Sequence, residues 1–457
     1  MAPPSPHPPR WCDAFCVTDA ETPTTLASRH DQWAARDAAV VWHGFTQMSA
    51  YTENTPIIVE SAEGRELIDV DGRRYLDAIS SLWVTTLGHR VPELDQAARE
   101  QLDRVAHSTM LGNGNVATIV LAEALAPRVP VSEPHFLFAS DGAAAVEQAL
   151  KIAFQYWTNQ GITTRTRYLA LGGAYHGDTI GSISVGAGGF GTDMFDPLRF
   201  PVLRAPGYDD PGWADTTVAM IATHAHELAA VVIEPLVQGA VGMWITDPDS
   251  VARVAAACKE HDVLLIADEV ATGFGRTGSL FASDQCEIRP DIMCIGKGLT
   301  GGYLAMAATV ASRRVYQAFL GPDLSEMTLY HGHSFSGNAL AAAVALRHLQ
   351  LFDELEVLAN VRARAAELRE ALAAMRMDRR AIGDIRQCGL MVGVEMKPPA
   401  DDLRWGRRIC AAAVRRGVLL RPLGDVVVLM PILTTTAEEI ERIVNVLGEA
   451  IDEVCGS

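Results

Sequence analysis

The stretch Asp291-Ile292-Met293-Cys294-Ile295-Gly296-Lys297-Gly298 places a lysine directly after a short apolar run. Four apolar residues that end in a turn signal predict a short buried strand. The flanking glycines permit a sharp turn and a close approach of the backbone to a ligand. A lysine here costs desolvation free energy, but a desolvated amine loses its proton easily and can form a Schiff base. A lysine that reaches the surface beyond the strand would give the same pattern.

A second apolar run, residues 261–270, reads His-Asp-Val-Leu-Leu-Ile-Ala-Asp-Glu-Val. It predicts a parallel strand with Asp268 at its carboxyl end, where open α/β sheets bind ligands. A buried carboxylate needs a cationic partner, such as the protonated pyridine nitrogen of pyridoxal phosphate. The alternative is a helix N-cap. Since Asp268 and Lys297 both stand at predicted strand ends, we expect them to share one site.

Three segments carry a resemblance to a known family. They read Asp-Glu-Val-Ala-Thr-Gly-Phe-Gly-Arg-Thr-Gly at 268–278, Pro-Asp-Ile at 290–292 and Gly-Lys-Gly-Leu-Thr-Gly-Gly-Tyr at 296–303. Together they resemble class III pyridoxal-phosphate aminotransferases, over roughly residues 40 to 455. The resemblance implies pyridoxal 5'-phosphate as cofactor, with Lys297, Asp268 and Tyr175 as catalytic residues. It also implies the α/β architecture of fold-type I enzymes: a large domain with a mostly parallel seven-stranded sheet flanked by helices, and a smaller α+β domain built from the chain ends.

Composition fits an enzyme of this kind. The 457 residues are enough for two or three domains and a large core. The net charge of −18 argues against a general affinity for nucleic acid or anionic membranes. No apolar run approaches the length of a membrane span, and the first ten residues lack the apolar core of a signal peptide. The eight cysteines are scattered without a Cys-x-x-Cys pair, which favours a reducing cytoplasm.

We expect four segments along the chain. Residues 1–38 begin proline-rich and predict a poorly ordered extension. Residues 39–91 predict the N-terminal part of the small domain, residues 92–350 the large cofactor-binding domain, and residues 351–457 the C-terminal α+β part of the small domain. Within the last segment, Thr435-x-x-Glu438 predicts a capping box before the final helix.

A strand, a turn and a helix at residues 135–157 predict a cradle for an anion, because free N–H groups and the helix dipole attract negative charge. Most such turns bind nothing. The family resemblance implies that Gly142 and Ala143 bind the cofactor phosphate. Asp141 departs from the family, which usually has a serine there. Because a carboxylate would repel a phosphate, we expect Asp141 to face away or to cap the helix.

The resemblance implies further site residues. Tyr175 is expected at the cofactor near the substrate, where its ring could stack on a flat cofactor face. Ser334, together with the adjacent Gly332 and His333, is expected to reach the cofactor phosphate of a partner subunit. A site completed by two chains implies a homodimer with shared active sites. Arg421 is expected to bind a carboxylate through its bidentate fork.

Two other patterns are weaker. Gly273-x-Gly275-x-x-Gly278 spells a dinucleotide fingerprint, but no helical pattern opens at its glycines. His224-x-His226 and His331-x-His333 lack a third ligand nearby, so we expect no metal site.

Within class III, the chain most resembles the branch that aminates 8-amino-7-oxononanoate to 7,8-diaminononanoate in biotin biosynthesis. The segments that carry this resemblance are 42–45 (Trp-His-Gly-Phe), 80–83 (Ser-Ser-Leu-Trp), 155–157 (Gln-Tyr-Trp), 175–178 (Tyr-His-Gly-Asp) and 420–422 (Leu-Arg-Pro). It implies that Arg421 binds the acceptor's carboxylate and that Trp83, Tyr175 and Asp178 line its channel. Phe45, Gly332 and Lys297 complete the expected substrate contacts.

The amine donor stays open between S-adenosylmethionine and lysine. Branch members that use S-adenosylmethionine usually have a tyrosine, a tryptophan and a tyrosine where Phe45, Leu82 and Val428 stand. Phe45 can still stack but lacks the phenolic hydroxyl, whereas Leu82 and Val428 have no aromatic ring. The loss of these two aromatic side chains favours a smaller donor, with lysine first. Two other hypotheses are a class III ω-amino-acid aminotransferase with a different ketone acceptor, and a non-catalytic protein that keeps the fold.

Overall fold

The computed structural model describes residues 28–188, 191–400 and 403–456. The chain divides into two compact units. Among the described residues, the smaller unit holds 28–60 and 68–73 and the larger unit holds 61–67 and 74–456. No helix in the described ranges is long and apolar enough to cross a membrane.

The smaller unit begins with helix α1 (Arg29–Val40), followed by the 3₁₀ turn η2 (Met48–Ala50). The sequence predicts a poorly ordered extension through residue 38, whereas residues 29–38 are helical; residues 1–27 lie outside the described residues. A capping box starts this helix: Ser28 Oγ accepts the Asp31 N–H at 3.1 Å, and the Asp31 carboxylate accepts the Ser28 N–H at 3.2 Å. These contacts satisfy N–H groups that otherwise lack partners at a helix start.

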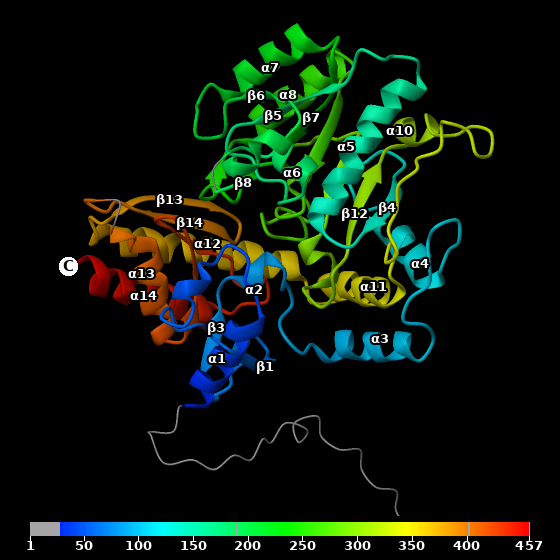
Figure 1. The fold of residues 1–457 in the computed structure, drawn as a ribbon. Helices are drawn as coiled ribbons and strands as arrows, with labels where there is room; N and C mark the ends of the chain where they lie inside the picture. Colours follow the sequence, from blue (N-terminus) through cyan, green and yellow to red (C-terminus); the bar gives the residue numbers. More distant parts are fainter. Residues whose placement is uncertain (1–27, 189–190, 401–402, 457) are drawn as a thin grey trace, which may run out of the picture. The chain divides into compact units, whose positions relative to one another are not determined.

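A seven-stranded sheet forms the centre of the larger unit, in the order β4-β12-β11-β10-β7-β5-β6 (Figure 1). Its strands are β4 (His135–Ala139), β5 (Arg167–Leu171), β6 (Leu203–Ala205), β7 (Leu228–Ile233), β10 (Leu264–Asp268), β11 (Ile292–Ile295) and β12 (Ala307–Ala311). Only β12 runs antiparallel to its neighbours in this sheet. The predicted α/β class with a mostly parallel seven-stranded sheet is confirmed.

Helices and short elements surround this sheet. They are α3 (Pro92–Leu102), α4 (Val116–Leu125), α5 (Gly142–Asn159), α6 (Ile180–Val185), η3 (Asp193–Leu198), α7 (Trp213–His224), the hairpin β8 (Val237–Gln238) and β9 (Trp244–Ile245), α8 (Pro248–Glu260), α9 (Ala282–Gln285), η4 (Lys297–Thr300), α10 (Arg313–Gln317) and α11 (Ala339–Glu354). Strand residues alternate between two apolar layers. Val231 and Leu265 pack among residues of α7 and α8, whereas Val232 and Ile266 pack with α5. Burial on both faces explains the continuous apolar runs of the strands.

The strand register brings the two predicted catalytic residues to one edge of the sheet. Asp268, the last residue of β10, pairs with Cys294 of the parallel strand β11. Lys297 follows β11 after one residue, Gly296, and opens the 3₁₀ turn η4. Since both strands run in the same direction, their carboxyl ends present Asp268 and Lys297 side by side.

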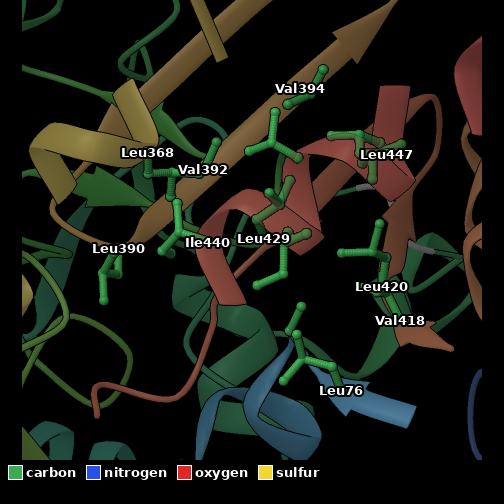
Figure 2. Close-up of a cluster of buried hydrophobic side chains, with 14 of the residues drawn as sticks. Leu76, Leu368, Leu390, Val392, Val394, Val418, Leu420, Leu429, Ile440 and Leu447 are labelled. Carbon is green, nitrogen blue, oxygen red and sulfur yellow. The ribbon is translucent and has the colours of Figure 1, made fainter. Parts of the chain in front are cut away.

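The C-terminal part of the larger unit holds a four-stranded antiparallel sheet in the order β13-β14-β17-β16. Its elements are α12 (Val357–Met377), β13 (Ile382–Cys388), β14 (Met391–Met396), α13 (Trp405–Arg415), β16 (Arg421–Leu423), β17 (Val426–Leu429) and α14 (Ala437–Cys455). Figure 2 shows their shared apolar core, in which Val392 and Leu429 of the sheet pack with Leu368, Ile440 and Leu447 of the helices. The predicted domain boundaries at residues 38, 91 and 350 stay predictions.

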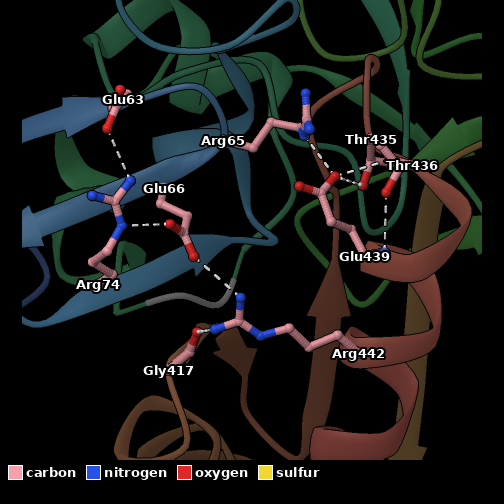
Figure 3. Close-up of polar contacts among 9 residues, drawn as sticks. All are labelled: Glu63, Arg65, Glu66, Arg74, Gly417, Thr435, Thr436, Glu439 and Arg442. Atoms are coloured by element: carbon pink, nitrogen blue, oxygen red, sulfur yellow. Dashed lines mark hydrogen bonds and ion pairs between the residues drawn. The ribbon is translucent and has the colours of Figure 1, made fainter.

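A further four-stranded sheet has the order β1-β2-β3-β15. Its strands are β1 (Val59–Glu63), β2 (Glu66–Asp69), β3 (Arg74–Asp77) and β15 (Val418–Leu419), and the short helix α2 (Ser80–Trp83) follows β3. Ion pairs join this region to α14 (Figure 3). Arg442 Nη1 lies 3.1 Å from Glu66 Oε1, and Arg65 Nε lies 2.5 Å from Glu439 Oε2. These two ion pairs link residues 65 and 66 to α14, the last helix of the chain.

The capping box of α14 lies one residue later than predicted. Thr436 and Glu439 form it, in place of Thr435 and Glu438. The Thr436 N–H donates to Glu439 Oε2 at 2.9 Å, and the Glu439 N–H donates to Thr436 Oγ1 at 3.3 Å (Figure 3). Adjacent threonines and adjacent glutamates allow either register in the sequence, and the geometry of the helix entry selects the second.

Candidate active site

A cavity of about 400 Å³ lies at the carboxyl edge of the large sheet. Its lining residues follow the ends of strands β4, β5, β7, β10 and β11, with Trp83 added from α2. The cavity brings together seven of the residues predicted from the sequence: Trp83, Gly142, Ala143, Tyr175, Asp178, Asp268 and Lys297. Glu234, His176, Gly177, Thr179, Asp141, Val270 and Ala271 complete the lining.

Lys297 is half-buried, and its amine lies 5.4 Å from the centroid of the Trp83 ring. Burial lowers the pKa of Lys297, although the negative charges of Asp268 and Glu234 oppose this shift. A neutral amine is the nucleophilic form. The lysine also has a left-handed backbone, with φ of +41°. Its neighbour Gly298 is needed for packing, because a Cβ there would come within 2.9 Å of Phe274 Cβ.

Asp268 is only 4% exposed and accepts two hydrogen bonds. His176 Nδ1 lies 2.7 Å from Asp268 Oδ2, and the Val270 N–H donates to Oδ1 at 3.0 Å. An ionised carboxylate only accepts, so the His176 proton sits on Nδ1. The other ring nitrogen, His176 Nε2, is buried and has no hydrogen-bond partner among the described residues. The pairing of His176 with Asp268 was not predicted from the sequence, since no spacing pattern links the two residues.

Glu234 and Asp178 hold Tyr175 from two sides. The Tyr175 N–H donates to Glu234 Oε1 at 3.0 Å, and the Tyr175 hydroxyl donates to Asp178 Oδ2 at 2.9 Å. Burial and the hydrogen bond to Asp178 raise the pKa of Tyr175, so the phenol stays protonated. Burial raises the pKa of Glu234 to about 7. The ring of Tyr175 is thus fixed at the cavity wall by its main chain and by its hydroxyl.

The start of α5 forms a tightly packed turn at one end of the cavity. A Cβ on Gly142 would come within 2.7 Å of Val270 Cγ1, and a Cβ on Gly177 within 2.5 Å of Ala143 Cβ. Asp141 Oδ1 accepts the Ala144 N–H at 2.9 Å, which confirms the prediction that Asp141 caps the helix. The cavity offers the amine of the half-buried Lys297, a buried carboxylate and a helix N-terminus, and these groups fit the aldehyde, the ring nitrogen and the phosphate of pyridoxal phosphate.

Five predicted site residues lie outside the cavity as the described residues define it. Gly332 and Ser334 are exposed, and Ser334 O lies 2.6 Å from His107 Nε2. The neighbouring His333 has a buried Nε2 with no partner among the described residues. Arg421 begins β16 and is exposed. Phe45 belongs to the smaller unit, where it is 70% exposed with φ of +54°. Their roles stay predictions.

The weaker sequence patterns have structural explanations. Gly275 packs against Phe352, whose Cζ would lie 2.8 Å from an added Cβ, and residues 273–278 form turns. His224 Nδ1 lies 2.7 Å from Glu227 Oε1, and Lys151 Nζ lies 3.2 Å from His331 Nδ1. Within the described ranges, no group of three or more histidine, cysteine or acidic residues is arranged to hold a metal ion.

Comparison with protein families places this site in a known context. The model of the family described as aminotransferase class-III matches residues 47–451. The chain belongs to the class III aminotransferases. This class III aminotransferase is 44% identical to the adenosylmethionine-8-amino-7-oxononanoate aminotransferase of Nitratidesulfovibrio vulgaris, over 94% of this chain and 83% of that protein. It is 41% identical to the enzyme of the same name from Geobacter sulfurreducens, over 92% and 97% of the two chains.

Solved structures agree with this assignment. The crystal structure of adenosylmethionine-8-amino-7-oxononanoate aminotransferase from Methanocaldococcus jannaschii superposes on this class III aminotransferase with a TM-score of 0.89 at 38% identity, covering 93% of this chain and 98% of that chain. A thermostable (S)-enantioselective omega-transaminase from Thermomicrobium roseum gives a TM-score of 0.87 at 32% identity, covering 93% and 98%. The predicted transaminase fold is confirmed.

Proposed function

We propose that this enzyme transfers an amino group to 8-amino-7-oxononanoate and so forms 7,8-diaminononanoate, a step of biotin biosynthesis. The relatives named for the adenosylmethionine-dependent reaction support the acceptor, since they match nearly the whole chain. The observation that carries the chemistry is the single cavity that joins Lys297, Asp268, Tyr175 and Asp178. We also propose that the enzyme works in the cytoplasm, which agrees with the buried free thiols of Cys258, Cys286 and Cys294.

Pyridoxal phosphate is the proposed cofactor. Lys297 Nζ would bind its aldehyde carbon, Asp268 its ring nitrogen, Gly142 and Ala143 its phosphate, and Tyr175 would stack on its ring. When bound, the cofactor supplies an electron-accepting ring that stabilises negative charge on the donor's carbon.

Lys297 Nζ then acts as a general base and acid: it takes a proton from the donor carbon and returns one. The lowered pKa of Lys297 suits this task, because burial favours the neutral amine, which is the form that can accept a proton. Asp268 contributes a fixed negative charge, and His176 orients that carboxylate through the 2.7 Å contact at Nδ1. Tyr175 and Trp83 line the cavity around these groups.

The acceptor is long and carries a carboxylate at one end and an amine at the other. We propose that Arg421 binds the carboxylate through its bidentate fork. Trp83, Tyr175 and Asp178 would line the channel between the carboxylate and the reacting carbon, and Phe45 and Gly332 would add contacts to the substrate.

The acceptor assignment is tested by single-turnover kinetics. The enzyme is first converted to its amino form with excess donor and then mixed with 8-amino-7-oxononanoate or with a simple ω-keto acid. We expect rapid amination of 8-amino-7-oxononanoate. Slow amination of this acceptor beside rapid amination of the simple keto acid would favour a general omega-transaminase, a class that also superposes on this chain.

We propose a homodimer whose active sites are each completed by the partner chain. The proposed contact is made by Ser334 and its neighbours Gly332 and His333, a segment in which Gly332 and Ser334 are exposed in the single chain. Ser334→Ala is expected to weaken cofactor retention. Ser336→Ala is the matched control, because the Ser336 hydroxyl donates to Phe138 O at 2.7 Å within its own chain.

Mixing two defective variants tests the shared site directly. In a heterodimer of Ser334→Ala and Lys297→Ala chains, one site carries both lesions and the other carries neither. We expect activity to reach about half of the wild-type value per heterodimer. If subunit exchange is demonstrated by mass and activity does not recover, each site belongs to one chain.

The preference for lysine as donor depends on which aromatic side chains are present to bind S-adenosylmethionine. A sulfonium nucleoside binds through stacking and cation–π contacts, whereas Leu82 and Val428 offer no aromatic face, and Val428 is fully buried. Two lost aromatic contacts, each worth roughly 0.5–1.5 kcal/mol, reduce affinity about five- to 150-fold. We expect kcat/KM for lysine to exceed that for S-adenosylmethionine. Leu82→Trp should shift the ratio towards S-adenosylmethionine; a wild-type ratio well below one would contradict the preference for lysine.

A further inference from the structure

Asp141 is an acidic residue of the cavity that the proposed mechanism does not use. It is exposed and lines the cavity beside Gly142 and Ala143. Its Oδ1 accepts the Ala144 N–H at 2.9 Å and so caps the 18-residue helix α5. The carboxylate therefore already occupies one of the N–H groups that this helix start could offer to a phosphate.

The surrounding side chains do little to offset this negative charge. Four carboxylates line the cavity, and within the described part of the chain Lys297 and His176 are the only basic side chains in that lining. In the proposed site, Lys297 would bind the aldehyde carbon of the cofactor, and His176 contacts Asp268. Neither side chain would therefore pair with an anion at the start of α5. Ala143 and Ala144 carry no hydroxyl group that could donate to a phosphate. From its own chain, an anion at the start of α5 thus meets main-chain N–H groups and one carboxylate.

We propose that Asp141 competes with the cofactor phosphate for the N-terminus of α5 and thereby weakens the retention of pyridoxal phosphate. This inference rests on the proposed function, because it takes the anion to be the cofactor phosphate. The physical cause is twofold. The phosphate must share the N-terminus of α5 with the Asp141 carboxylate, which already accepts one of the N–H groups of the helix. The two groups are also both negatively charged, and like charges repel at short distance. The chain consequently exchanges its cofactor more readily than it would with an uncharged cap.

Asp141→Asn is the direct test, because asparagine keeps a capping oxygen for the Ala144 N–H and removes the charge. The measurement is the dissociation constant of the apoenzyme for pyridoxal phosphate and for pyridoxal, which lacks the phosphate. We expect the Asp141→Asn variant to bind pyridoxal phosphate about tenfold more tightly at low ionic strength, with pyridoxal unchanged. The difference should narrow as salt rises, since salt screens the repulsion between exposed charges.

Asp247→Asn is the matched control. Asp247 caps α8 in the same way, with its Oδ1 accepting the Ser250 N–H at 2.8 Å, and it does not line the cavity. We expect no change in cofactor affinity for this variant. Asp141→Ser, which also keeps a cap, provides a second uncharged variant if the asparagine variant folds poorly.

The outcomes separate the two proposals. Unchanged or weaker binding of pyridoxal phosphate in both Asp141 variants would overturn the competition. Equal tightening for pyridoxal would overturn it as well, because the effect would then not involve the phosphate. If wild type and variants alike fail to bind pyridoxal phosphate, the cofactor assignment itself is wrong.

Discussion

Replacing Lys297 with alanine is expected to lower the rate of amino transfer by more than about 10⁴-fold, because one amine serves as both the nucleophile and the proton carrier. No other lysine lines the cavity as the described residues define it. The fold should persist, since the substitution removes a desolvated amine and leaves the strand β11 before it unchanged. Alanine meets the same left-handed backbone at this position as lysine does.

Two measurements check this expectation. Single-turnover amination reports the rate, and borohydride reduction followed by mass spectrometry reports whether the cofactor is fixed to the chain. We expect fixation at residue 297 in wild type and none in the variant. Lys259→Ala, an exposed lysine in the last turn of α8, is the control that should keep both properties. Wild-type turnover in Lys297→Ala chains would show that another group binds the cofactor.

The central sheet could be predicted because its strands are buried on both faces. Val231 and Val232 face opposite layers, and both are fully buried, so the run remains apolar without alternation. The meeting of Asp268 and Lys297 was predictable for a related reason, since the carboxyl ends of parallel strands share one edge. The cap at Asp141 was one of two alternatives expected because a carboxylate would repel a phosphate, and the structure adopts it.

Other features required tertiary contacts that no sequence pattern encodes. The pair of His176 and Asp268 joins the turn after β5 to the end of β10, and Glu234 reaches the Tyr175 N–H from the end of β7. Neither pair has a characteristic spacing. The register of the cap at Thr436 was likewise set by geometry, because the sequence permits two alternatives.

The roles expected for Ser334, Arg421 and Phe45 depend on a different kind of information. Each was inferred from resemblance, and each requires a contact with a substrate or with another chain. The packing of one chain determines that Ser334 and Arg421 are exposed, but it does not supply the molecule that they would contact. The heterodimer experiment tests the role of Ser334 directly.

Asp268→Asn is expected to keep part of the cofactor and to lose about 10²–10³-fold in kcat. Removing one preorganised electrostatic group from an active site typically costs roughly 3–4 kcal/mol of barrier. The structure adds a second reason: Asp268 accepts from both His176 Nδ1 and the Val270 N–H, and asparagine has only one oxygen. If its amide group faces His176, the ring proton must move to Nε2, which is buried without a partner among the described residues.

Asp291→Asn is the matched control for this variant, because Asp291 is a carboxylate at the opposite end of the same strands and accepts the Leu265 N–H at 3.0 Å. Both substitutions should lower the melting temperature, but only Asp268→Asn should change kcat and the absorbance of the bound cofactor. The absorbance matters because a purely structural effect would lower cofactor content without altering the spectrum of the fraction that binds. A loss in kcat smaller than about tenfold, with an unchanged spectrum, would show that Asp268 does not face the ring nitrogen.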